Sequence, residues 1–400
     1  MSEHQDQPIV IIGSGLAGYT VIRELRKIDK DVPITLITRE PGYFYSKPML
    51  STAFANSKAA EQLISTSSDA MATQLNLTVL GGTDVHSIDA QARLLRTSNG
   101  ELGYSKLVLA LGADQIDLQL HGTAANQVMT VNDLEDYARF RGAIEGRKRV
   151  AILGAGLIGC EFANDLTLGG YSVDVIDLAP HALGRLLPEA AATALEEKLS
   201  AAGVRWHFGS TAQSIDAHGD AIRITLANGT TIDTDVVLSA VGLRPRIQLA
   251  RDAGIATGMG IQVNRQLQTN LDSIYAIGDC AETEGLVLPY VMPIMQAARA
   301  LAPTLLGQAG SLQYPAMPVM VKTPAYPIVV SPPAKGAEGQ WNNAEVEGGM
   351  VCRFESGDGQ LLGFALLGSA TAERAALVKL LPPVLAGPFK AIRTARPHTN

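Results

Sequence analysis

The chain has 400 residues, 46% of them hydrophobic, and a formal net charge of −7. This length predicts two or three domains with buried cores. The acidic balance argues against nucleic acid as a partner, and no lysine- or arginine-rich cluster indicates a site for an anionic membrane surface. No basic region precedes an apolar N-terminal stretch, and no uncharged apolar run reaches the ~20 residues that a spanning helix needs. We therefore expect a cytoplasmic protein.

The first strong signal lies at residues 9–18, where a β-branched apolar run leads into Gly13, Gly15 and Gly18. The run predicts a buried parallel strand, and residues 16–27 predict a helix after the turn. In such a GxGxxG turn, the glycines allow a tight bend, close approach of a pyrophosphate and close helix packing. The phosphates would lie at the positive end of the helix dipole. Taken alone, the pattern also fits a plain glycine-rich turn.

A second strand is predicted at residues 33–38, and a Rossmann site needs an acidic residue at its end to bind a ribose hydroxyl. Glu40 is the nearest candidate, two residues beyond Thr38; a surface carboxylate is the alternative. Residues 43–51 then combine aromatics with Lys47 and predict an ordered loop rather than a strand. By composition alone, Lys47 is more typical of a solvated side chain.

Residues 149–159 repeat the arrangement of strand, GxGxxG turn and helix, 141 residues after the first copy. Each copy is followed by a further strand and then by an apolar run that ends at glycine, at residues 107–113 and 236–242. Two unrelated turns would not repeat the whole arrangement. We therefore predict that the chain binds two dinucleotides.

The strand at residues 171–176 ends at Asp177, in the place where a ribose-binding acid is expected. Leu178 follows, rather than the arginine that a 2′-phosphate would need. A phosphate beside Asp177 would meet a repulsion of about 4 kcal/mol per charge pair at ~4 Å and an effective dielectric of ~20. Arg185 would weaken this repulsion, but the pattern still favours NADH over NADPH.

Several shorter signals complete the two halves. Residues 84–104 predict a hairpin around Asn99-Gly100, and residues 131–144 predict a connecting helix with an acidic start. Strands are predicted at residues 204–208, 222–226 and 231–238, the last two joined by a hairpin turn at Asn228-Gly229.

The chain then returns to the first half. Residues 271–281 predict a buried strand that ends at Gly278-Asp279. An acid at such an edge can bind ribityl or phosphate-linked hydroxyls, although Asp279 could equally be a helix N-cap. A helix is predicted at residues 292–306, with Pro293 in its first turn.

From about residue 314 the composition changes to proline-punctuated β segments. Strands are predicted at residues 319–322, 328–330, 351–354 and 361–367, and a helix at residues 372–380. These elements predict a small α+β domain, and we expect the tail after Pro382 to be loosely ordered.

The three cysteines, Cys160, Cys280 and Cys352, are far apart and none lies in a CxxC pair. No Cys/His cluster has metal-ligand spacing. We interpret them as isolated buried thiols, so we predict neither a metal site nor a redox disulfide.

Together, the two GxGxxG segments, residues 107–113 and residues 274–279 resemble the pyridine nucleotide–disulfide oxidoreductase superfamily. Within it, residues 45–51, 154–166, 239–246 and 321–324 are similar to segments of the bacterial rubredoxin–NAD(+) reductases. The resemblance covers nearly all of the chain from Pro8 to about Leu380.

This resemblance implies an α/β fold with two Rossmann-like dinucleotide-binding domains and a small C-terminal α+β domain. The FAD-binding domain would comprise residues 1–113 and 245–314. The NADH-binding domain, residues 114–244, would be inserted into it, and residues 315–400 would form the acceptor-docking domain.

The resemblance also implies the site residues. FAD would be held by Gly13, Ser14, Gly15, Leu16, Ala17, Gly18, Glu40, Lys47, Pro48, Val85, Ala110, Gly112, Asp279, Val291 and Lys322. NAD would be held by Gly154, Gly156, Leu157, Ile158, Gly159, Asp177, Val241 and Gly242. The implied catalytic residues are Lys47, whose cation would stabilise the reduced flavin, and Glu161, which would approach the nicotinamide. A plain first-turn helix acid is the alternative for Glu161.

Three features depart from the family pattern or narrow it. Leu111 replaces a common threonine, and Thr38 occupies the usual position of the ribose-binding acid. The absence of a cysteine near Lys47 argues against the peroxidase and disulfide reductase members.

The implied function is a reductase that takes a hydride from NADH onto FAD and passes single electrons to rubredoxin. Rubredoxin would dock over the flavin edge, with Lys322 as a candidate docking residue or, alternatively, an ordinary surface lysine. Two rival functions are a ferredoxin reductase component of an oxygenase system and a non-catalytic NADH/FAD-bound signalling protein.

Overall fold

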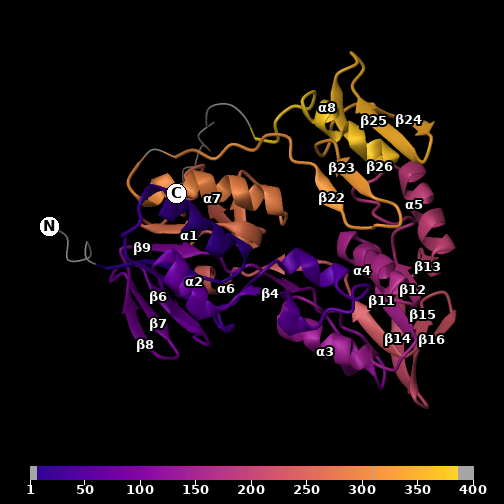
Figure 1. The fold of residues 1–400 in the computed structure, drawn as a ribbon, viewed down its shortest axis with the longest axis horizontal. Helices are drawn as coiled ribbons and strands as arrows, with labels where there is room; N and C mark the ends of the chain where they lie inside the picture. The colour runs from indigo at the N-terminus through magenta and orange to yellow at the C-terminus, as the bar shows by residue number, and fades with distance from the viewer. Residues whose placement is uncertain (1–6, 309, 386–400) are drawn as a thin grey trace, which may run out of the picture.

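The computed structural model describes residues 7–308 and 310–385. These residues form three units, each built around its own β-sheet (Figure 1). No helix among them combines the length and the apolarity needed to cross a membrane.

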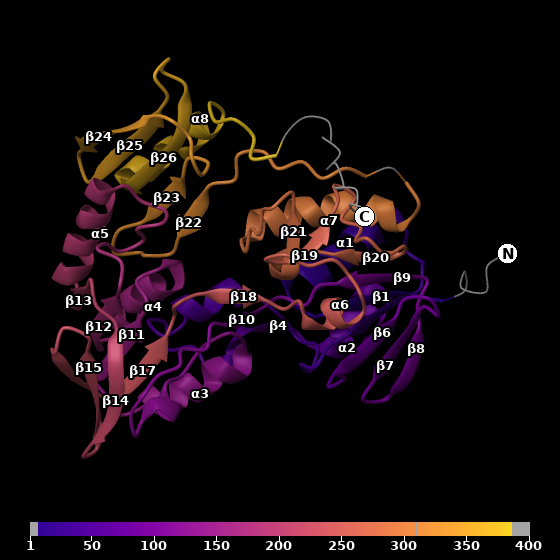
Figure 2. The ribbon, with the colours of Figure 1, turned by 180° about the vertical axis from the view of Figure 1, so that it is seen from behind.

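The first unit is built around a parallel sheet of five strands in the order β20-β9-β1-β2-β5. The strands are β1 (Ile9–Ile12), β2 (Ile34–Ile37), β5 (Thr78–Leu80), β9 (Lys106–Leu109) and β20 (Ile274–Ala276). Its helices are α1 (Leu16–Ile28), α2 (Ser68–Leu75), α6 (Gln248–Asp252) and α7 (Val291–Leu305). Strand β20 pairs with β9, and α7 lies beside α1 in both views, so the chain does return to its first half (Figures 1 and 2).

Two predictions in the first unit need correction. The expected single hairpin is a three-stranded meander of β6 (Val85–Asp89), β7 (Leu94–Thr97) and β8 (Gly100–Gly103), because the chain also turns between β6 and β7. The expected loop before Lys47 contains a short strand, β3 (Phe44–Tyr45), paired with β4 (Ile64–Thr66). A 3-10 helix, η1 (Lys47–Thr52), follows it, with Pro48 in its first turn.

The second unit is built around a parallel sheet in the order β13-β12-β11-β17. The strands are β11 (Arg149–Leu153), β12 (Ser172–Asp177), β13 (Val204–Phe208) and β17 (Val236–Ser239), with helices α3 (Leu134–Ile144), α4 (Leu157–Leu168) and α5 (Glu189–Ala201). An antiparallel meander of β14 (Ala212–His218), β15 (Ala221–Leu226) and β16 (Thr231–Thr234) packs against this sheet. The strand predicted at residues 231–238 is two strands, because Asp235 leaves the ladder to accept hydrogen bonds from Lys148 N and Arg149 N.

Two antiparallel crossings connect the first and second units. Strand β10 (Ala113–Gln115) leaves the first unit and pairs with β18 (Leu243–Pro245), which returns to it. The chain therefore enters and leaves the second unit at one place. Within the first unit, a further pair of strands, β19 (Ile261–Val263) and β21 (Ala281–Thr283), precedes α7.

The C-terminal unit is an antiparallel sheet in the order β22-β23-β26-β25-β24. Its strands are β22 (Val319–Val321), β23 (Ile328–Ser331), β24 (Gln340–Val346), β25 (Gly349–Glu355) and β26 (Leu361–Gly368). The edge strand β24 was not predicted, and the predicted final helix is only α8 (Arg374–Val378), preceded by a 3-10 turn. Most of the tail expected to be loosely ordered, residues 386–400, lies outside the described residues.

The third glycine of each GxGxxG turn permits the close packing of helix on strand that its position predicts. A Cβ on Gly18 would lie 2.0 Å from Gly13 O, and one on Gly159 would lie 1.9 Å from Gly154 O. Both distances are far below van der Waals contact with rigid backbone. The two helices therefore start where they do only because these positions lack a side chain.

A buried ion pair joins the three units. Glu161, on α4, has no exposed surface, and its carboxylate accepts hydrogen bonds from Ser51 Oγ at 2.6 Å and Lys322 N at 2.9 Å. Lys322 Nζ also lies 2.6 Å from Glu161 Oε2, and it donates to Pro48 O and Ser51 Oγ. Each partner comes from a different unit, so this contact fixes the C-terminal sheet relative to both nucleotide-binding motifs.

Substitution Gly159→Ala tests the packing of α4 on its strand. The new methyl group would overlap backbone, so we expect the free energy of unfolding in a urea titration to fall by about 1 to 3 kcal/mol. The matched control is Gly142→Ala in α3, where an added Cβ meets nothing within 4 Å. The control should gain up to about 1 kcal/mol, because alanine is the better helix former. Equal behaviour of the two variants would contradict the packing argument.

Substitution Lys322→Met tests the buried ion pair. It leaves the Glu161 carboxylate buried without its cation, so we expect a loss of about 3 kcal/mol in the free energy of unfolding. The double variant Lys322→Met/Glu161→Gln carries no orphaned charge and should recover much of that loss. If the single variant unfolds at the same urea concentration as the unsubstituted protein, the pair does not hold the units together.

Candidate functional site

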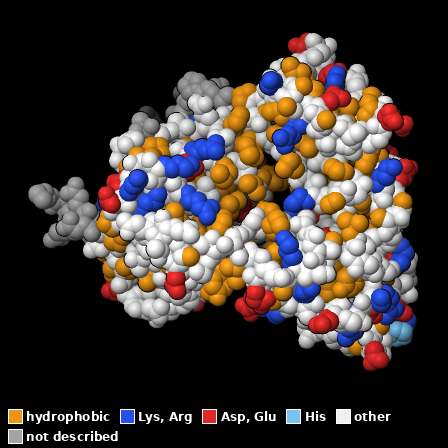
Figure 3. Space-filling view, viewed as in Figure 1, with side chains coloured by type: hydrophobic (Ala, Val, Ile, Leu, Met, Phe, Trp, Pro, Cys, Tyr) orange, Lys and Arg blue, Asp and Glu red, His pale blue; other side chains and the backbone are white. Residues whose placement is uncertain are grey.

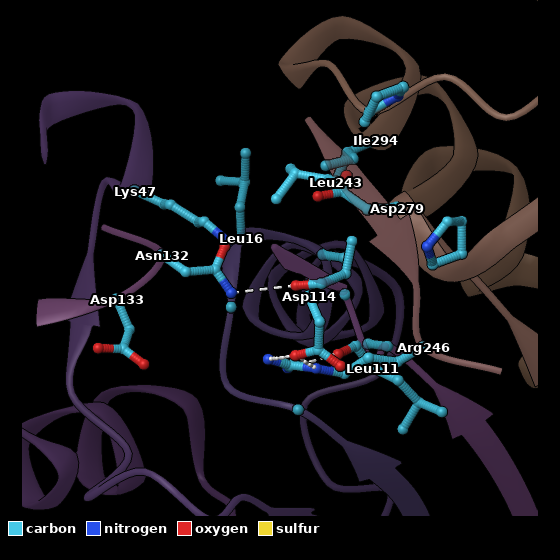
Figure 4. Close-up of a pocket in the computed structure, with 18 of the residues that line it drawn as sticks. Leu16, Lys47, Leu111, Asp114, Asn132, Asp133, Leu243, Arg246, Asp279 and Ile294 are labelled. Carbon is cyan, nitrogen blue, oxygen red and sulfur yellow. Dashed lines mark hydrogen bonds and ion pairs between the residues drawn. The ribbon is translucent and has the colours of Figure 1, made fainter. Parts of the chain in front are cut away.

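A cavity of about 1100 Å³ lies where the three units meet. Its wall includes the first GxGxxG turn, η1, the start of α3, the start of α4, β18, the start of α7 and the segment around β22. Figure 4 shows charged and polar side chains from several of these elements pointing into one space. No other part of the described chain brings so many of the predicted residues together.

Most of the predicted FAD-binding residues line this cavity. They are Gly13, Ser14, Gly15, Leu16, Ala17, Glu40, Lys47, Pro48, Val85, Ala110, Gly112, Asp279, Val291 and Lys322. Gly18 does not line it, because it packs beneath the turn against Gly13. These residues are spread over more than 300 positions of the sequence, and the fold collects them at the carboxyl edge of the first sheet.

The predicted NAD-binding residues divide into two groups. Leu157, Ile158 and Gly242 line the cavity, as does Glu161. Gly154, Gly156, Gly159, Asp177 and Val241 lie outside its wall, at the carboxyl edge of the second sheet. The first turn of α4 therefore connects the second glycine motif to the cavity.

The N-terminus of α1 opens into the cavity. Its N-cap is Gly15, which supplies no capping side chain, and a Cβ at that position would meet nothing within 4 Å. The first N–H groups of the helix are thus available to an anion, which the helix dipole also favours. This donor set fits the pyrophosphate of a dinucleotide.

The residue after β2 departs from the usual Rossmann pattern, in which an acidic residue ends the second strand. Thr38 Oγ1 lies 3.0 Å from Ser14 Oγ and accepts a hydrogen bond from Glu40 N at 3.2 Å. The threonine therefore braces the glycine turn, and the carboxylate that faces the cavity is that of Glu40. Tyr45 donates a hydrogen bond to the Glu40 carboxylate at 3.3 Å. Burial raises the pKa of Glu40, and the nearby Asp133 carboxylate raises it further.

Lys47 and Asp279 place opposite charges in the same cavity. Burial lowers the pKa of the Lys47 ammonium, and the nearby Asp279 carboxylate opposes this shift. Burial raises the pKa of Asp279, while Lys47 and Arg246 oppose that rise. Lys47 is therefore not the solvated lysine that its composition suggested; it donates a hydrogen bond to Asn132 Oδ1 at 2.7 Å.

The structure bears on two alternatives that the sequence left open. The alternative for Glu161, a plain first-turn helix acid, does not apply, because α4 begins four residues earlier and the side chain is completely buried. Lys322 does not present a free ammonium at a docking face, because its Nζ points inward to Glu161 and Ser51. Both side chains border the cavity as a pair.

In the second motif, Asp177 is fixed by the backbone. Its carboxylate accepts hydrogen bonds from Ala155 N at 2.5 Å and Ala179 N at 2.7 Å. The acid is thus held directly against the glycine turn, whereas Arg185 is exposed. Asp177 therefore stands at the end of β12, beside the second glycine turn, where the sequence pattern predicts an acidic residue.

The structure also brings in residues that sequence reasoning missed. Asn132, Ser51 and Arg246 all line the cavity. Arg246 binds Asp114 Oδ1 at 2.6 Å and Leu111 O at 2.9 Å, and so closes the edge of the site near Asp279. Ser51 and Arg246 lay within segments recognised by resemblance, residues 45–51 and 239–246, but no sequence signal distinguished Asn132.

The described residues contain no redox disulfide and no cluster of His, Cys, Asp or Glu that could hold a metal ion. Cys160, Cys280 and Cys352 are buried and unpaired, and burial raises the pKa of Cys280 and of Cys352 to about 11. The thiols are therefore protonated at neutral pH and inert as nucleophiles.

Comparison with known proteins identifies the family. Residues 7–302 match the pyridine nucleotide-disulphide oxidoreductase family, and residues 311–381 match the family described as a rubredoxin binding C-terminal domain. The chain is 49% identical to the rubredoxin-NAD(+) reductase of Alcanivorax borkumensis, over 94% of this chain and 99% of that protein. It is 46% identical to the rubredoxin-NAD(+) reductase of Acinetobacter baylyi, over 94% and 98%.

Among solved structures, the ferredoxin reductase of Rhodopseudomonas palustris matches with a TM-score of 0.85 and 27% identity, over 95% of this chain and 96% of that one. The fold expected from the sequence, two dinucleotide-binding units and a small C-terminal unit, is confirmed. The chain therefore belongs to the pyridine nucleotide-disulphide oxidoreductase family, in the branch that contains the rubredoxin-NAD(+) reductases.

Proposed function

We propose that this chain is an NADH-dependent flavoprotein that passes electrons to rubredoxin. The observation that carries the proposal is that residues 311–381, which match a rubredoxin-binding domain, supply part of the cavity wall. The high identity to two rubredoxin-NAD(+) reductases supports the same function. NADH would lose two electrons and a proton in forming NAD⁺, and two ferric rubredoxins would each take up one electron.

FAD, when bound, supplies the conversion from hydride transfer to single-electron transfer. The chain's own groups would bind and orient it. The N-terminus of α1 would hold the pyrophosphate, Glu40 a ribose hydroxyl and Asp279 further hydroxyls, while Lys47 would place positive charge beside the ring system.

The second motif would hold NADH in the same manner. The N-terminus of α4, whose N-cap Gly156 has no capping side chain, would bind the pyrophosphate, and Asp177 would accept hydrogen bonds from the ribose. Leu157, Ile158 and Glu161 would border the nicotinamide, since they lie both on α4 and in the cavity wall. The catalytic assignments of Lys47 and Glu161 are part of this proposal.

We propose the same three domains that the sequence predicts. The FAD-binding domain would be residues 1–113 and 245–314, the NADH-binding domain residues 114–244, and the acceptor-docking domain residues 315–400. The pairing of β20 with β9 supports a two-part FAD domain, and the crossing of β10 and β18 supports boundaries near residues 113 and 245. We also propose a cytoplasmic location, which three unpaired cysteines support.

Exposed apolar side chains at the mouth of the cavity support docking of a small electron-transfer protein there. Val291, Met292, Ile158 and Met320 are between 36% and 58% exposed, and all four line the cavity. Figure 3 shows hydrophobic side chains on both sides of a central hollow. A transient redox complex needs only a small interface, which such a rim provides.

An anaerobic assay with NADH and either rubredoxin or a [2Fe–2S] ferredoxin tests the acceptor. We expect rapid reduction of rubredoxin and at least tenfold slower reduction of the ferredoxin, measured by the absorbance of each acceptor. Preference for the ferredoxin would favour the role of an oxygenase-coupled reductase. Bound FAD without turnover of either acceptor would favour a non-catalytic signalling protein.

Substitution Asp177→Asn tests the preference for NADH over NADPH. Loss of the negative charge removes repulsion of a 2′-phosphate, so the ratio of kcat/KM for NADPH to that for NADH should rise at least tenfold. The matched control, Asp220→Asn in the exposed turn between β14 and β15, should leave this ratio unchanged. An unchanged ratio in Asp177→Asn would remove the proposed role of Asp177.

A further inference from the structure

Asn132 occupies a buried position between the two nucleotide-binding units and has no assigned role. It is 9% exposed, lines the cavity and stands immediately before Asp133, the N-cap of α3. Figure 4 shows its side-chain amide beside the end of the Lys47 side chain. It is the hydrogen-bond acceptor that the structure gives to the Lys47 ammonium.

The orientation of the Asn132 amide is fixed by its two partners. Ala113 O can only accept, so it selects Nδ2, which donates to it at 3.1 Å. Lys47 Nζ can only donate, so it selects Oδ1, at 2.7 Å. The two requirements agree, and rotation of the amide would break both hydrogen bonds.

The backbone of Asn132 is held as firmly as its side chain. Its N–H donates to Asp136 Oδ2 at 2.9 Å, and Asp136 N donates to Asp133 Oδ1 at 2.9 Å, so the residue is part of the capped start of α3. Helix α3 is in turn tied to the segment after η1, because Tyr137 donates to Lys58 O at 2.7 Å. Asn132 therefore sits at a helix start that is hydrogen-bonded both within itself and to the segment that follows η1.

The partner of Lys47 is neutral although carboxylates are near. Among the described residues, Lys47 makes no ion pair within 4.0 Å. Asp279, Glu40 and Asp133 favour its charged form, and Arg246 opposes it. A direct carboxylate contact would cancel most of the field of a buried ammonium. A neutral amide oxygen satisfies one N–H group and leaves the positive charge available to the cavity.

We propose that Asn132 is a positioning residue that holds the Lys47 ammonium toward the cavity on a neutral acceptor, so that its charge favours reduction of the bound flavin. This inference rests on the proposed function, because it requires FAD in the cavity. Without Asn132, the ammonium would be free to turn to Asp279 and pair with it. The Lys47 ammonium would then stabilise the reduced flavin less strongly.

The test is a double-mutant cycle on the purified FAD-loaded protein, with the flavin midpoint potential measured by anaerobic dye titration. Asn132→Leu should weaken the binding of reduced relative to oxidised flavin about tenfold, which lowers the potential of a two-electron couple by about 30 mV. Lys47→Met should lower the potential at least as much. In the Lys47→Met background, Asn132→Leu should cause no further change, because Asn132 acts through Lys47.

Two further variants provide a substitute for Asn132→Leu and a control. Asn132→Ala removes the acceptor without adding a charge, so it should lower the potential as far as Asn132→Leu, and it serves if the leucine variant does not fold. Asn343→Leu, at an exposed position on β24, should leave the potential unchanged.

The outcomes separate this inference from the proposed function. An unchanged potential in both Asn132 variants, or an equal drop when Lys47 is already replaced, would overturn the role of Asn132 alone. The expected shifts without reduction of rubredoxin would support the role of Asn132 and overturn the acceptor. A purified protein that binds no FAD would overturn both.

Discussion

Burial of the Glu161 carboxylate is the constraint on which the arrangement of the three units depends. A completely buried charge is costly unless it is paired and hydrogen-bonded. Here the donors are Ser51 from the first unit and both nitrogens of Lys322 from the C-terminal unit, while the acid itself stands on α4 of the second. Separating any one unit would leave a buried charge without its partners, so the cavity keeps one wall from each.

Two copies of the same strand–turn–helix motif contribute to the cavity, and they differ in the polar residues that follow the next strand. In both halves, a helix starts over a glycine turn because the third glycine of the motif, its sixth residue, lets the helix approach the strand. The halves differ at the next strand. Asp177 accepts hydrogen bonds from its own glycine turn, whereas Thr38 braces the first turn and Glu40 faces the cavity. Two related sites thus acquire different polar edges, as two different dinucleotides require.

The charges around the cavity follow from how each one is partnered. Lys322 is paired directly with a carboxylate, so it serves the assembly of the units. Lys47 is held by a neutral amide, so its charge remains available to whatever the cavity binds. Sequence reasoning placed both lysines at the flavin, but it could not distinguish these roles, because the partners lie 85 and 161 residues away from them.

The sequence by itself determined the two strand–turn–helix motifs, the return of the chain at β20, the position of Asp177 and most of the C-terminal strands. These features depend on local sterics and periodicity, which are encoded within a few residues. It missed β24 and the strand within the expected loop, because short or exposed strands form only when a neighbour pairs with them. Only the tertiary structure decided that Glu161 is buried, that Lys322 turns inward and that Asn132 supports Lys47. Those facts depend on contacts between segments distant in the chain, where burial and hydrogen bonding, rather than local preference, set the energy.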